Sequence, residues 1–275
     1  MAKFKAACIQ INTKDNMQKN LKEVSRLIEK AAKKGADLIT LPENTPFMSM
    51  DRKKLFAENI EEKNHPAVLH FCELAKNLKK WILIGSIFVK AGKNKLYNRS
   101  ILINDKGKIS ARYDKIHLYN VRLKNGEVYT ERRNFKSGNN SVIAKTPWGN
   151  LGMTICYDLR FPHLYRELAK KGADFISVPA AFVKYTGKAH WHILLQARAI
   201  ENGCYIFAPA QTGKHPGNRE TYGHSLIINP WGEILKDAKR RKGFVIAEID
   251  TDMIKQVRKS MPSLTHDKPF RLKRH

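Results

Sequence analysis

The sequence lacks the features that mark secreted, zinc-binding and membrane-spanning proteins. Its four cysteines, at positions 8, 72, 156 and 204, lie far apart and form no CxxC pair, so a disulfide framework and a zinc site are both disfavoured. No apolar run approaches the roughly 20 residues that a membrane helix needs. The first residues do not resemble a signal peptide. We therefore expect a reduced, cytoplasmic protein without a membrane partner.

Cofactor-binding patterns are also missing. The glycine-containing segments 92–95 and 136–140 lack the spacing of a phosphate-binding loop. His190, His192 and Glu201 fall within one expected helix, but the spacing of the two histidines does not place both on one helical face. We therefore expect neither a cofactor nor a metal ion.

Acidic residues are scarce. The chain has 25 of them against 51 lysines and arginines, which gives a formal net charge of +26. Such a surplus attracts anions and favours nonspecific association with nucleic acids or membranes. The basic residues are nevertheless scattered, with the densest runs at 239–242 and 271–275, and no aromatic residues alternate with a basic stripe. A solvated basic surface is the preferred interpretation, and a specific nucleic-acid partner is not expected.

An internal repeat indicates the architecture. The segment Lys-Lys-Gly-Ala-Asp-Leu-Ile-Thr-Leu-Pro at 33–42 recurs as Lys-Lys-Gly-Ala-Asp-Phe-Ile-Ser-Val-Pro at 170–179. Each copy follows a helical pattern and continues into a short apolar strand. Gly35 and Gly172 stand where a left-handed residue commonly ends a helix. Two helix–strand units of this kind predict two similar halves folded against each other.

Hairpin signals lie between and after these units. Segments 100–109, 145–153 and 227–235 each place a turn between two strand-like runs, and 185–202 is expected to be a helix. Helices that alternate with strands and hairpins fit two mixed sheets packed face to face, with helices outside, in a four-layer α-β-β-α sandwich. No linker divides the chain, so we expect one domain over 1–275, of which 260–275 forms a basic C-terminal tail.

Three chemically active side chains follow predicted strands. Cys156 interrupts the apolar run that begins at 152, Glu43 follows the run 38–42, and Lys115 follows 109–114. A free cysteine is usually a small core residue. A thiol, a carboxylate and an ammonium group at the ends of separate strands nevertheless form a candidate cysteine hydrolase site.

These residues stand in segments that resemble the nitrilase (carbon–nitrogen hydrolase) superfamily. The similarity extends from about residue 3 to about residue 270. It is carried by Leu-Pro-Glu-Asn (41–44), Tyr-Asp-Lys-Ile-His-Leu (113–118), Ile-Cys-Tyr-Asp-Leu-Arg-Phe-Pro (155–162), the segment 189–202, and Ala-Gln-Thr-Gly (210–213) followed by Tyr-Gly-His-Ser (222–225).

The resemblance implies a role for each residue. Cys156 would be the nucleophile, and Glu43 would take its proton. The charge of Lys115 would favour the thiolate and, together with the backbone N–H of Tyr157, would stabilise the tetrahedral oxyanion. Glu131 matches a second carboxylate of the family that orients the lysine and the substrate. The alternative for Glu131 is a solvated loop residue beside the arginines at 132 and 133.

Within the superfamily, the segments 156–162 and 181–191 most resemble the deaminated glutathione amidase branch. The resemblance implies that Arg160, Phe182 and Thr186 line the substrate pocket. Arg160 could hold a substrate carboxylate through two hydrogen bonds. The alternative for Arg160 is a structural ion pair with Asp158 or with a helix end.

The sequence thus predicts an amidase that hydrolyses a small, carboxylate-bearing amide, namely deaminated glutathione, through a thioester with release of ammonia or an amine. Alternatives are an ω-amidase acting on α-ketoglutaramate or α-ketosuccinamate, an N-carbamoyl amino acid hydrolase and a nitrilase. An inactive scaffold and a basic nucleic-acid-binding protein are the alternatives from other classes. The resemblance also implies a homodimer or higher homo-oligomer formed through helices after the nucleophile, with which the apolar stretches 164–169 and 193–200 are compatible.

Overall fold

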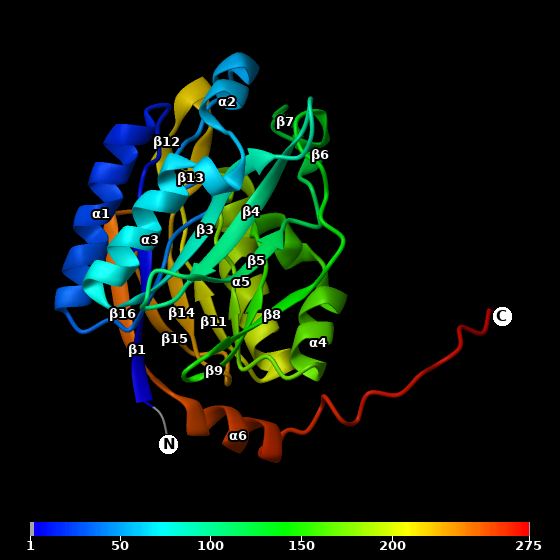
Figure 1. Cartoon of the computed structure of the whole chain (residues 1–275). Helices are drawn as coiled ribbons and strands as arrows, with labels where there is room; N and C mark the ends of the chain where they lie inside the picture. Colours follow the sequence, from blue (N-terminus) through cyan, green and yellow to red (C-terminus); the bar gives the residue numbers. More distant parts are fainter. Residues whose placement is uncertain (1–2, 275) are drawn as a thin grey trace.

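The computed structural model describes residues 3–274 and contains two six-stranded mixed sheets that pack face to face (Figure 1). The first sheet has the order β16-β1-β2-β3-β4-β5, formed by β1 (Lys3–Gln10), β2 (Leu38–Thr40), β3 (Trp81–Lys90), β4 (Leu96–Ile103), β5 (Ile109–Asp114) and β16 (Gly243–Asp250). The second has the order β15-β14-β11-β10-β9-β8, formed by β8 (Val142–Thr146), β9 (Gly149–Met153), β10 (Phe175–Ser177), β11 (Tyr205–Ala208), β14 (Leu226–Ile228) and β15 (Ile234–Asp237).

Helices cover the outer face of each sheet. Short ribbons and 3₁₀ turns complete the chain. The helices are α1 (Met17–Lys33), α2 (Arg52–Glu58), α3 (Pro66–Leu78), α4 (Pro162–Lys170), α5 (Lys184–Asn202) and α6 (Thr251–Ser260). The ribbons pair β6 (Asn120–Arg122) with β7 (Val128–Thr130) and β12 (Thr212–Lys214) with β13 (Glu220–Tyr222). The 3₁₀ turns are η1 (Glu62–Asn64), η2 (Glu131–Arg133), η3 (Cys156–Arg160) and η4 (Pro216–Asn218).

Alternating side chains divide the interior into layers. Along β1, Phe4 and Cys8 belong to the cluster between the sheets, whereas Ala7 and Ile9 belong to the cluster under α1 and α3. Leu164 of α4 packs in the same cluster as β9, β10 and β11, together with Trp191 and Leu195 of α5. The predicted four-layer α-β-β-α sandwich is therefore confirmed.

The two copies of the internal repeat form strands at equivalent positions in the two sheets. β2 lies between the parallel strands β1 and β3, and β10 lies between the parallel strands β9 and β11. Antiparallel strands flank each parallel trio on both sides. Gly35 and Gly172 follow α1 and α4 with φ of 87° and 93°, values that favour glycine because a Cβ is disfavoured there. The two predicted halves are therefore visible in the strand topology.

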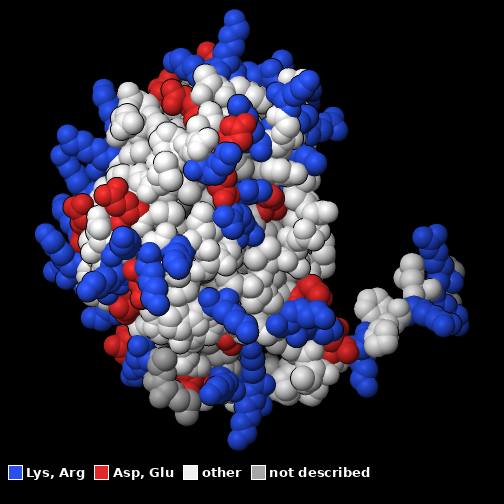
Figure 2. Space-filling view, in the orientation of Figure 1, with Lys and Arg blue, Asp and Glu red and all other residues white. Residues whose placement is uncertain are grey.

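Residues 261–274 follow α6 without forming a helix or a strand, and Figure 1 shows this segment running away from the sheets. The single domain over 1–275 stays a prediction, and residues 1, 2 and 275 lie outside the described part. Between residues 3 and 274, none of the helices combines the length and the apolar character needed to cross a membrane. On the face shown in Figure 2, lysines and arginines are dispersed and acidic residues lie among them.

Two buried histidines make the stability of the fold sensitive to pH. His65 caps α3 by accepting from the N–H of Ala67, and the Nδ1–H of His215 donates to the Thr13 carbonyl at 2.9 Å. Burial lowers the pKa of His65 and of His215 to about 4, from an ordinary value of 6.5. Below pH 6.5 the unfolded chain binds protons that the folded chain still excludes, so stability falls as the pH is lowered toward 4.

We expect the free energy of unfolding to fall by several kcal/mol between pH 7 and pH 4, since each histidine contributes on the order of 3 kcal/mol. Urea unfolding at pH 7, 5.5 and 4 measures this. The double variant His65→Gln/His215→Gln has a lower stability at pH 7 but a flatter dependence on pH. An equal slope in parent and variant would contradict this assignment.

Candidate active site

Cys156 lies in a strained turn after β9. It is the first residue of η3 and has a φ of 46°, in the left-handed region that a side chain disfavours. Its N–H donates to the Pro179 carbonyl at 2.9 Å. Asp158 stabilises the turn by accepting from the N–H of Ile155 at 2.8 Å. The thiol is thereby fixed beyond the end of β9, the strand next to the edge of the second sheet.

Asp158 also connects this turn to the lysine segment. The buried carboxylate accepts from the hydroxyl of Tyr113 at 2.7 Å and from the N–H of His117 at 3.1 Å. The ring Nδ1 of His117 lies 2.7 Å from the same carboxylate, and the ring stacks on Phe161 with centroids 3.6 Å apart. The Asp158 side chain therefore fixes the turn that contains Cys156, which follows β9, relative to Lys115, which follows β5.

Lys115 bridges two carboxylates. Its Nζ lies 2.8 Å from Glu43 Oε1 and 3.1 Å from Glu131, and the side chains of Lys115 and Glu43 are each 1% exposed. The second oxygen of Glu43 accepts from the N–H of Ala181 at 2.8 Å, and Asn98 donates to the first at 2.9 Å. Loops after β2, β5 and β10 thus meet around one buried ion pair.

Glu131 is not the solvated loop residue of the alternative interpretation. Its side chain is 19% exposed, and besides binding Lys115 it accepts from the N–H of Tyr119 at 2.8 Å. The arginines at 132 and 133 are exposed and do not bind it. The structure therefore brings Glu131 to the same centre as Glu43, Lys115 and Cys156.

Electrostatics define which of these groups is charged. Burial raises the pKa of the Cys156 thiol well above its ordinary value, and the nearby carboxylate of Glu43 raises it further. Burial acts against ionisation of Glu43 too, but Lys115 and then Arg219 outweigh it and lower the pKa of Glu43. Burial likewise opposes the charge on Lys115, yet Glu131 and Glu43 raise its pKa overall.

The resting site therefore contains a thiol, a carboxylate and an ammonium group. Lys115 does favour the thiolate, but its effect on the pKa of Cys156 is smaller than those of burial and Glu43. The charge of Lys115 alone does not offset burial, so ionisation of the thiol needs a base, the role that the sequence predicts for Glu43. Glu43 is the ionised carboxylate beside the thiol.

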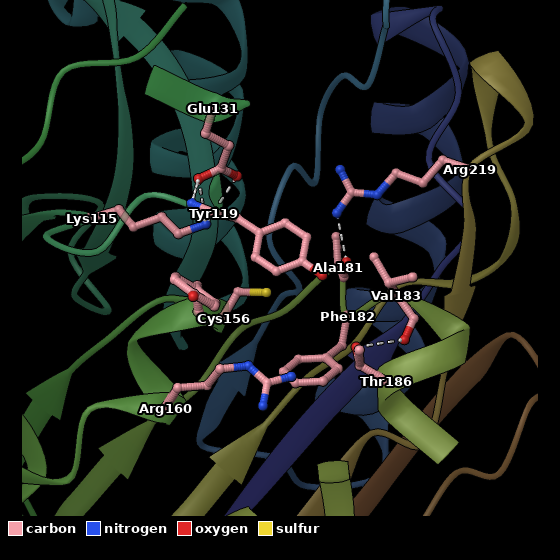
Figure 3. A pocket seen from close by; sticks show the side chains of 11 residues that line it. Lys115, Tyr119, Glu131, Cys156, Arg160, Ala181, Phe182, Val183, Thr186 and Arg219 are labelled. Atoms are coloured by element: carbon pink, nitrogen blue, oxygen red, sulfur yellow. Dashed lines mark hydrogen bonds and ion pairs between the residues drawn. The ribbon is translucent and has the colours of Figure 1, made fainter. Parts of the chain in front are cut away.

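A pocket of about 280 Å³ opens onto the thiol. Figure 3 shows Cys156 pointing into it between Lys115 and Arg160. The residues lining it are Lys115, Tyr119, Glu131, Cys156, Tyr157, Arg160, Ala181, Phe182, Val183, Thr186 and Arg219. The structure thus gathers into one pocket all the residues predicted for catalysis or binding except Glu43, whose carboxylate binds the ammonium group of Lys115.

Arg160 does not pair with Asp158, so the ion pair with Asp158 that the alternative interpretation offered is wrong. Asp158 is occupied by Tyr113 and His117, and within residues 3–274 no carboxylate lies within ion-pair distance of Arg160. The guanidinium group instead lies 3.3 Å from His190 Nδ1 and stacks over the ring of Phe182, 5.3 Å from its centroid. Its positive charge faces the pocket without a protein counter-charge.

Four residues that line the pocket were not predicted from the sequence, and two of them, Tyr119 and Arg219, have polar side chains. Tyr119 directly follows the segment 113–118, and Arg219 lies between 210–213 and 222–225, which are all segments that resemble the superfamily. Arg219 donates to the Ala181 carbonyl at 2.7 Å. Their closeness in sequence to these segments was the one feature that could have indicated a place in the pocket, since neither residue belongs to a periodic pattern.

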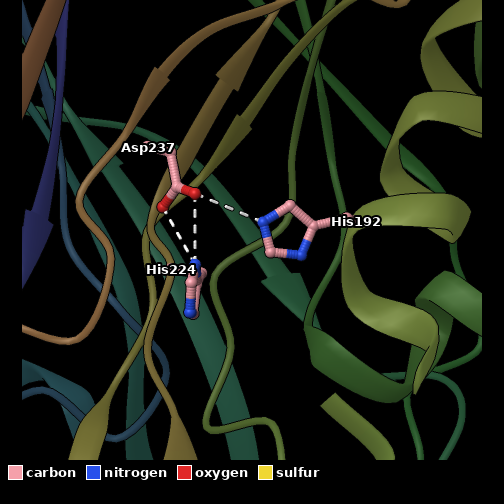
Figure 4. A group of neighbouring side chains, drawn as sticks. All are labelled: His192, His224 and Asp237. Atoms are coloured by element: carbon pink, nitrogen blue, oxygen red, sulfur yellow. Dashed lines mark hydrogen bonds and ion pairs between the residues drawn. The ribbon is translucent and has the colours of Figure 1, made fainter. Parts of the chain in front are cut away.

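A separate cluster has ligand types suited to a metal ion. Among the described residues, His192, His224 and Asp237 form the one such group, with His192 Nε2 3.4 Å and His224 Nδ1 3.1 Å from Asp237 (Figure 4). The ammonium group of Lys239 also binds Asp237 at 2.9 Å. Through these contacts the Asp237 carboxylate connects α5 to β15. They supply no residue to the cysteine pocket.

The histidines considered from the sequence do not converge. His190 contacts Arg160, whereas Glu201 pairs with Arg198 at 2.8 Å. Only His192 of that group reaches the cluster with Asp237. The sequence could not reveal this cluster because its three members come from α5, the segment before β14, and β15.

The fold and the site define a hydrolase of the nitrilase type, and comparison with known proteins agrees. The family model described as carbon-nitrogen hydrolase matches residues 5–259, so the chain belongs to the carbon–nitrogen hydrolase family. It is an enzyme, an amide hydrolase of the cysteine-dependent nitrilase superfamily.

Similar proteins cover nearly the whole chain. A deaminated glutathione amidase of Synechocystis sp. is 45% identical over 97% of this chain and 98% of its own length. A deaminated glutathione amidase of Yersinia enterocolitica is 37% identical over 98% of this chain and 94% of its own length. Nit3 of Saccharomyces cerevisiae, a solved structure, has a TM-score of 0.85 at 30% identity over 94% of each chain. The NitFhit protein of C. elegans has a TM-score of 0.90 at 32% identity, and the match covers 98% of this chain and 66% of that one.

Proposed function

We propose that the chain hydrolyses the amide bond of deaminated glutathione, with Cys156 as nucleophile. The observation that carries the proposal is the meeting of a buried thiol, an ionised Glu43 and an unpaired Arg160 around one pocket. Full-length similarity to proteins with that name supports the substrate. The substrate is a small molecule that carries a carboxylate.

The first half of the reaction forms a thioester. Glu43 takes the proton from the Cys156 thiol, and the sulfur attacks the amide carbonyl carbon. The oxygen becomes negatively charged and is stabilised by the Lys115 ammonium group and the backbone N–H of Tyr157. When the carbon–nitrogen bond breaks, Glu43 returns the proton to the nitrogen and the amine leaves.

The second half uses the same groups. Glu43 removes a proton from a water molecule, whose oxygen attacks the thioester carbonyl. The carbon–sulfur bond then breaks, the acid is released, and the proton on Glu43 returns to sulfur. Glu131 keeps Lys115 in position throughout, because it binds the ammonium group at 3.1 Å while Glu43 binds it at 2.8 Å.

Arg160, Phe182 and Thr186 bind the acyl half of the substrate. Arg160 can form two charge-assisted hydrogen bonds with a carboxylate, and no protein carboxylate of residues 3–274 competes for it. The ring of Phe182, which is buried against Trp191 with centroids 5.0 Å apart, keeps the guanidinium group facing the pocket. Thr186 is buried in the first turn of α5 and closes this end.

The test is hydrolysis of deaminated glutathione, α-ketoglutaramate, glutamine, an N-carbamoyl amino acid and a nitrile, with the acid product and the released amine or ammonia both measured. We expect deaminated glutathione to have the highest kcat/KM. Preference for another member of the panel would keep the chemistry and overturn the substrate. Hydrolysis of none would overturn the proposed function.

Replacing Arg160 by glutamine is expected to raise KM for deaminated glutathione by roughly 10- to 100-fold, because the charge-assisted hydrogen bonds to the substrate carboxylate are lost. The effect on kcat should be smaller. The matched control is Arg26→Gln on the exposed face of α1, which should leave both constants unchanged. An unchanged KM in Arg160→Gln would show that the substrate carboxylate lies elsewhere.

We propose a homodimer formed through α5. Ile193 and Ile200 lie one heptad apart on this helix and are 68% and 56% exposed. Gly232 lies against Ile200, and its neighbour in sequence, Trp231, is 55% exposed. The apolar residues of 164–169 do not contribute, because Leu164 and Leu168 are buried in the core. We therefore expect light scattering to give twice the mass of one chain, and Ile193→Glu to give a monomer. A monomeric parent would contradict the dimer.

A reducing, cytoplasmic location and one domain over the chain belong to the same proposal. All four cysteines are free, and the carbon–nitrogen hydrolase match spans both sheets. The substrate, as a thiol-containing peptide derivative, is chemically suited to a reducing compartment.

A further inference from the structure

A second pocket adjoins the one that contains the thiol. It opens to solvent and has a volume of about 710 Å³, and Tyr119, Glu131 and Arg219 line both pockets. In Figure 3 the side chains of Tyr119 and Arg219 point toward one another across the upper part of the cysteine pocket. The two pockets together form a chamber with a shared wall.

The position of Glu43 decides which half of a substrate faces the second pocket. The amide nitrogen must face Glu43, because this carboxylate gives it the proton on which the amine leaves. Asn44, the next residue, lines the second pocket, and Arg219 is close enough to Glu43 to affect its ionisation. Arg160, Phe182 and Thr186 line the cysteine pocket alone. The acyl half therefore points toward Arg160 and the amine half toward the second pocket.

The shared wall contains hydrogen-bond donors that lack acceptors. Tyr119 Oη and Arg219 Nε are buried and make no hydrogen bond with the described residues. The Tyr119 hydroxyl approaches Thr186 without reaching a normal hydrogen-bond geometry. Buried donors without partners cost free energy, so donors that lack a protein partner are satisfied by ordered water or by a ligand.

Arg219 also lacks a counter-ion. It donates to the neutral Ala181 carbonyl and lies over the ring of Tyr129, 5.6 Å from the centroid, but no carboxylate within residues 3–274 lies within ion-pair distance of it. A group that satisfied both donors and the charge would be anionic. The rest of the second pocket offers apolar surface, contributed by Met48, Met50, Leu55, Phe88, Val128 and Phe135.

We propose that the second pocket binds the amine half of an N-substituted amide, with Arg219 and Tyr119 holding a carboxylate on that half. This inference rests on the proposed function: deaminated glutathione is an amide of 2-oxoglutarate with cysteinylglycine, and its amine half has both a thiol side chain and a carboxylate.

The test compares two substrates with the same acyl half, deaminated glutathione and α-ketoglutaramate, whose leaving group is ammonia. The quantity measured is the ratio of their kcat/KM values. We expect Arg219→Gln to lower the ratio about 100-fold and Tyr119→Phe, which removes one hydroxyl, about 10-fold, mainly through KM of deaminated glutathione. Arg160→Gln, which affects the shared acyl half, should lower both values and leave the ratio within about 3-fold.

An unchanged ratio in Arg219→Gln and Tyr119→Phe would overturn the amine subsite while leaving the proposed function intact. If the parent hydrolyses neither substrate, the proposed function fails, and binding of S-methylcysteinylglycine, measured by calorimetry, decides on the subsite. Binding to the parent that weakens about 10-fold or more in Arg219→Gln supports it. Absence of binding to the parent, or equal binding to both proteins, overturns it.

Discussion

Replacing Cys156 by alanine is expected to abolish hydrolysis, with kcat falling by ~10⁴-fold or more, because no thioester can form without the sulfur. The substrate should still bind, since Arg160 and the pocket walls are unchanged. The fold should persist too, because the turn is fixed by backbone groups and Asp158 rather than by the thiol. Product formation and the thermal midpoint are the measurements.

Cys72→Ala is the matched control, because Cys72 is a partly buried free thiol on α3, away from the pocket. It should retain full activity. Intact-mass spectra of the parent mixed with substrate should show an acyl adduct that is missing from Cys156→Ala and present in Cys72→Ala. Substantial turnover by Cys156→Ala would exclude covalent catalysis at this residue.

Replacing Glu43 by glutamine is expected to lower kcat by roughly 10³-fold or more, because the same carboxylate moves protons in both half-reactions. Glutamine has nearly the same shape and can still accept from Ala181, so the pocket should keep its form. The exposed Glu127→Gln, in the turn between β6 and β7, is the matched control and should be fully active.

The dependence on pH distinguishes loss of a base from loss of structure. In the parent the pKa of the thiol is raised and that of Glu43 is lowered, so neither should change ionisation near neutral pH and the rate should be flat there. In Glu43→Gln the reaction depends on thiolate formed without a base. Because the thiolate fraction rises with pH below a raised pKa, the residual rate should increase about tenfold per pH unit. A flat residual rate would argue against Glu43 as the base.

Much of the fold could be predicted from local pattern. The hairpins at 100–109, 145–153 and 227–235 correspond to β4–β5, β8–β9 and β14–β15, since a turn between apolar runs is a short-range signal. The repeat at 33–42 and 170–179 located β2 and β10 for a related reason, because both copies use the same helix-ending glycine.

Some residues of the candidate site could likewise be predicted from local pattern, and others could not. Glu43, Lys115 and Cys156 follow strands, and a strand end marks a position near the edge of a sheet. The partner of Arg160 could not be predicted, because the positive φ of Cys156 turns the following residues so that Asp158 faces His117 instead. Arg219 follows η4 in an irregular loop, where the direction of a side chain depends on distant contacts such as that with Ala181.

The two sheets have the same strand topology, but different side chains follow their corresponding strands. After β2 the chain continues Pro42-Glu43, whereas after β10 it continues Pro179-Ala180, so the two copies of the repeat diverge at the residue that bears the carboxylate. Loops that follow strands of the first sheet supply Glu43 and Lys115. Loops that follow strands of the second sheet supply Cys156 and the N–H of Ala181, which donates to Glu43. With the roles proposed here, neither half is catalytic alone, and the rate of hydrolysis reports how well the two halves have assembled.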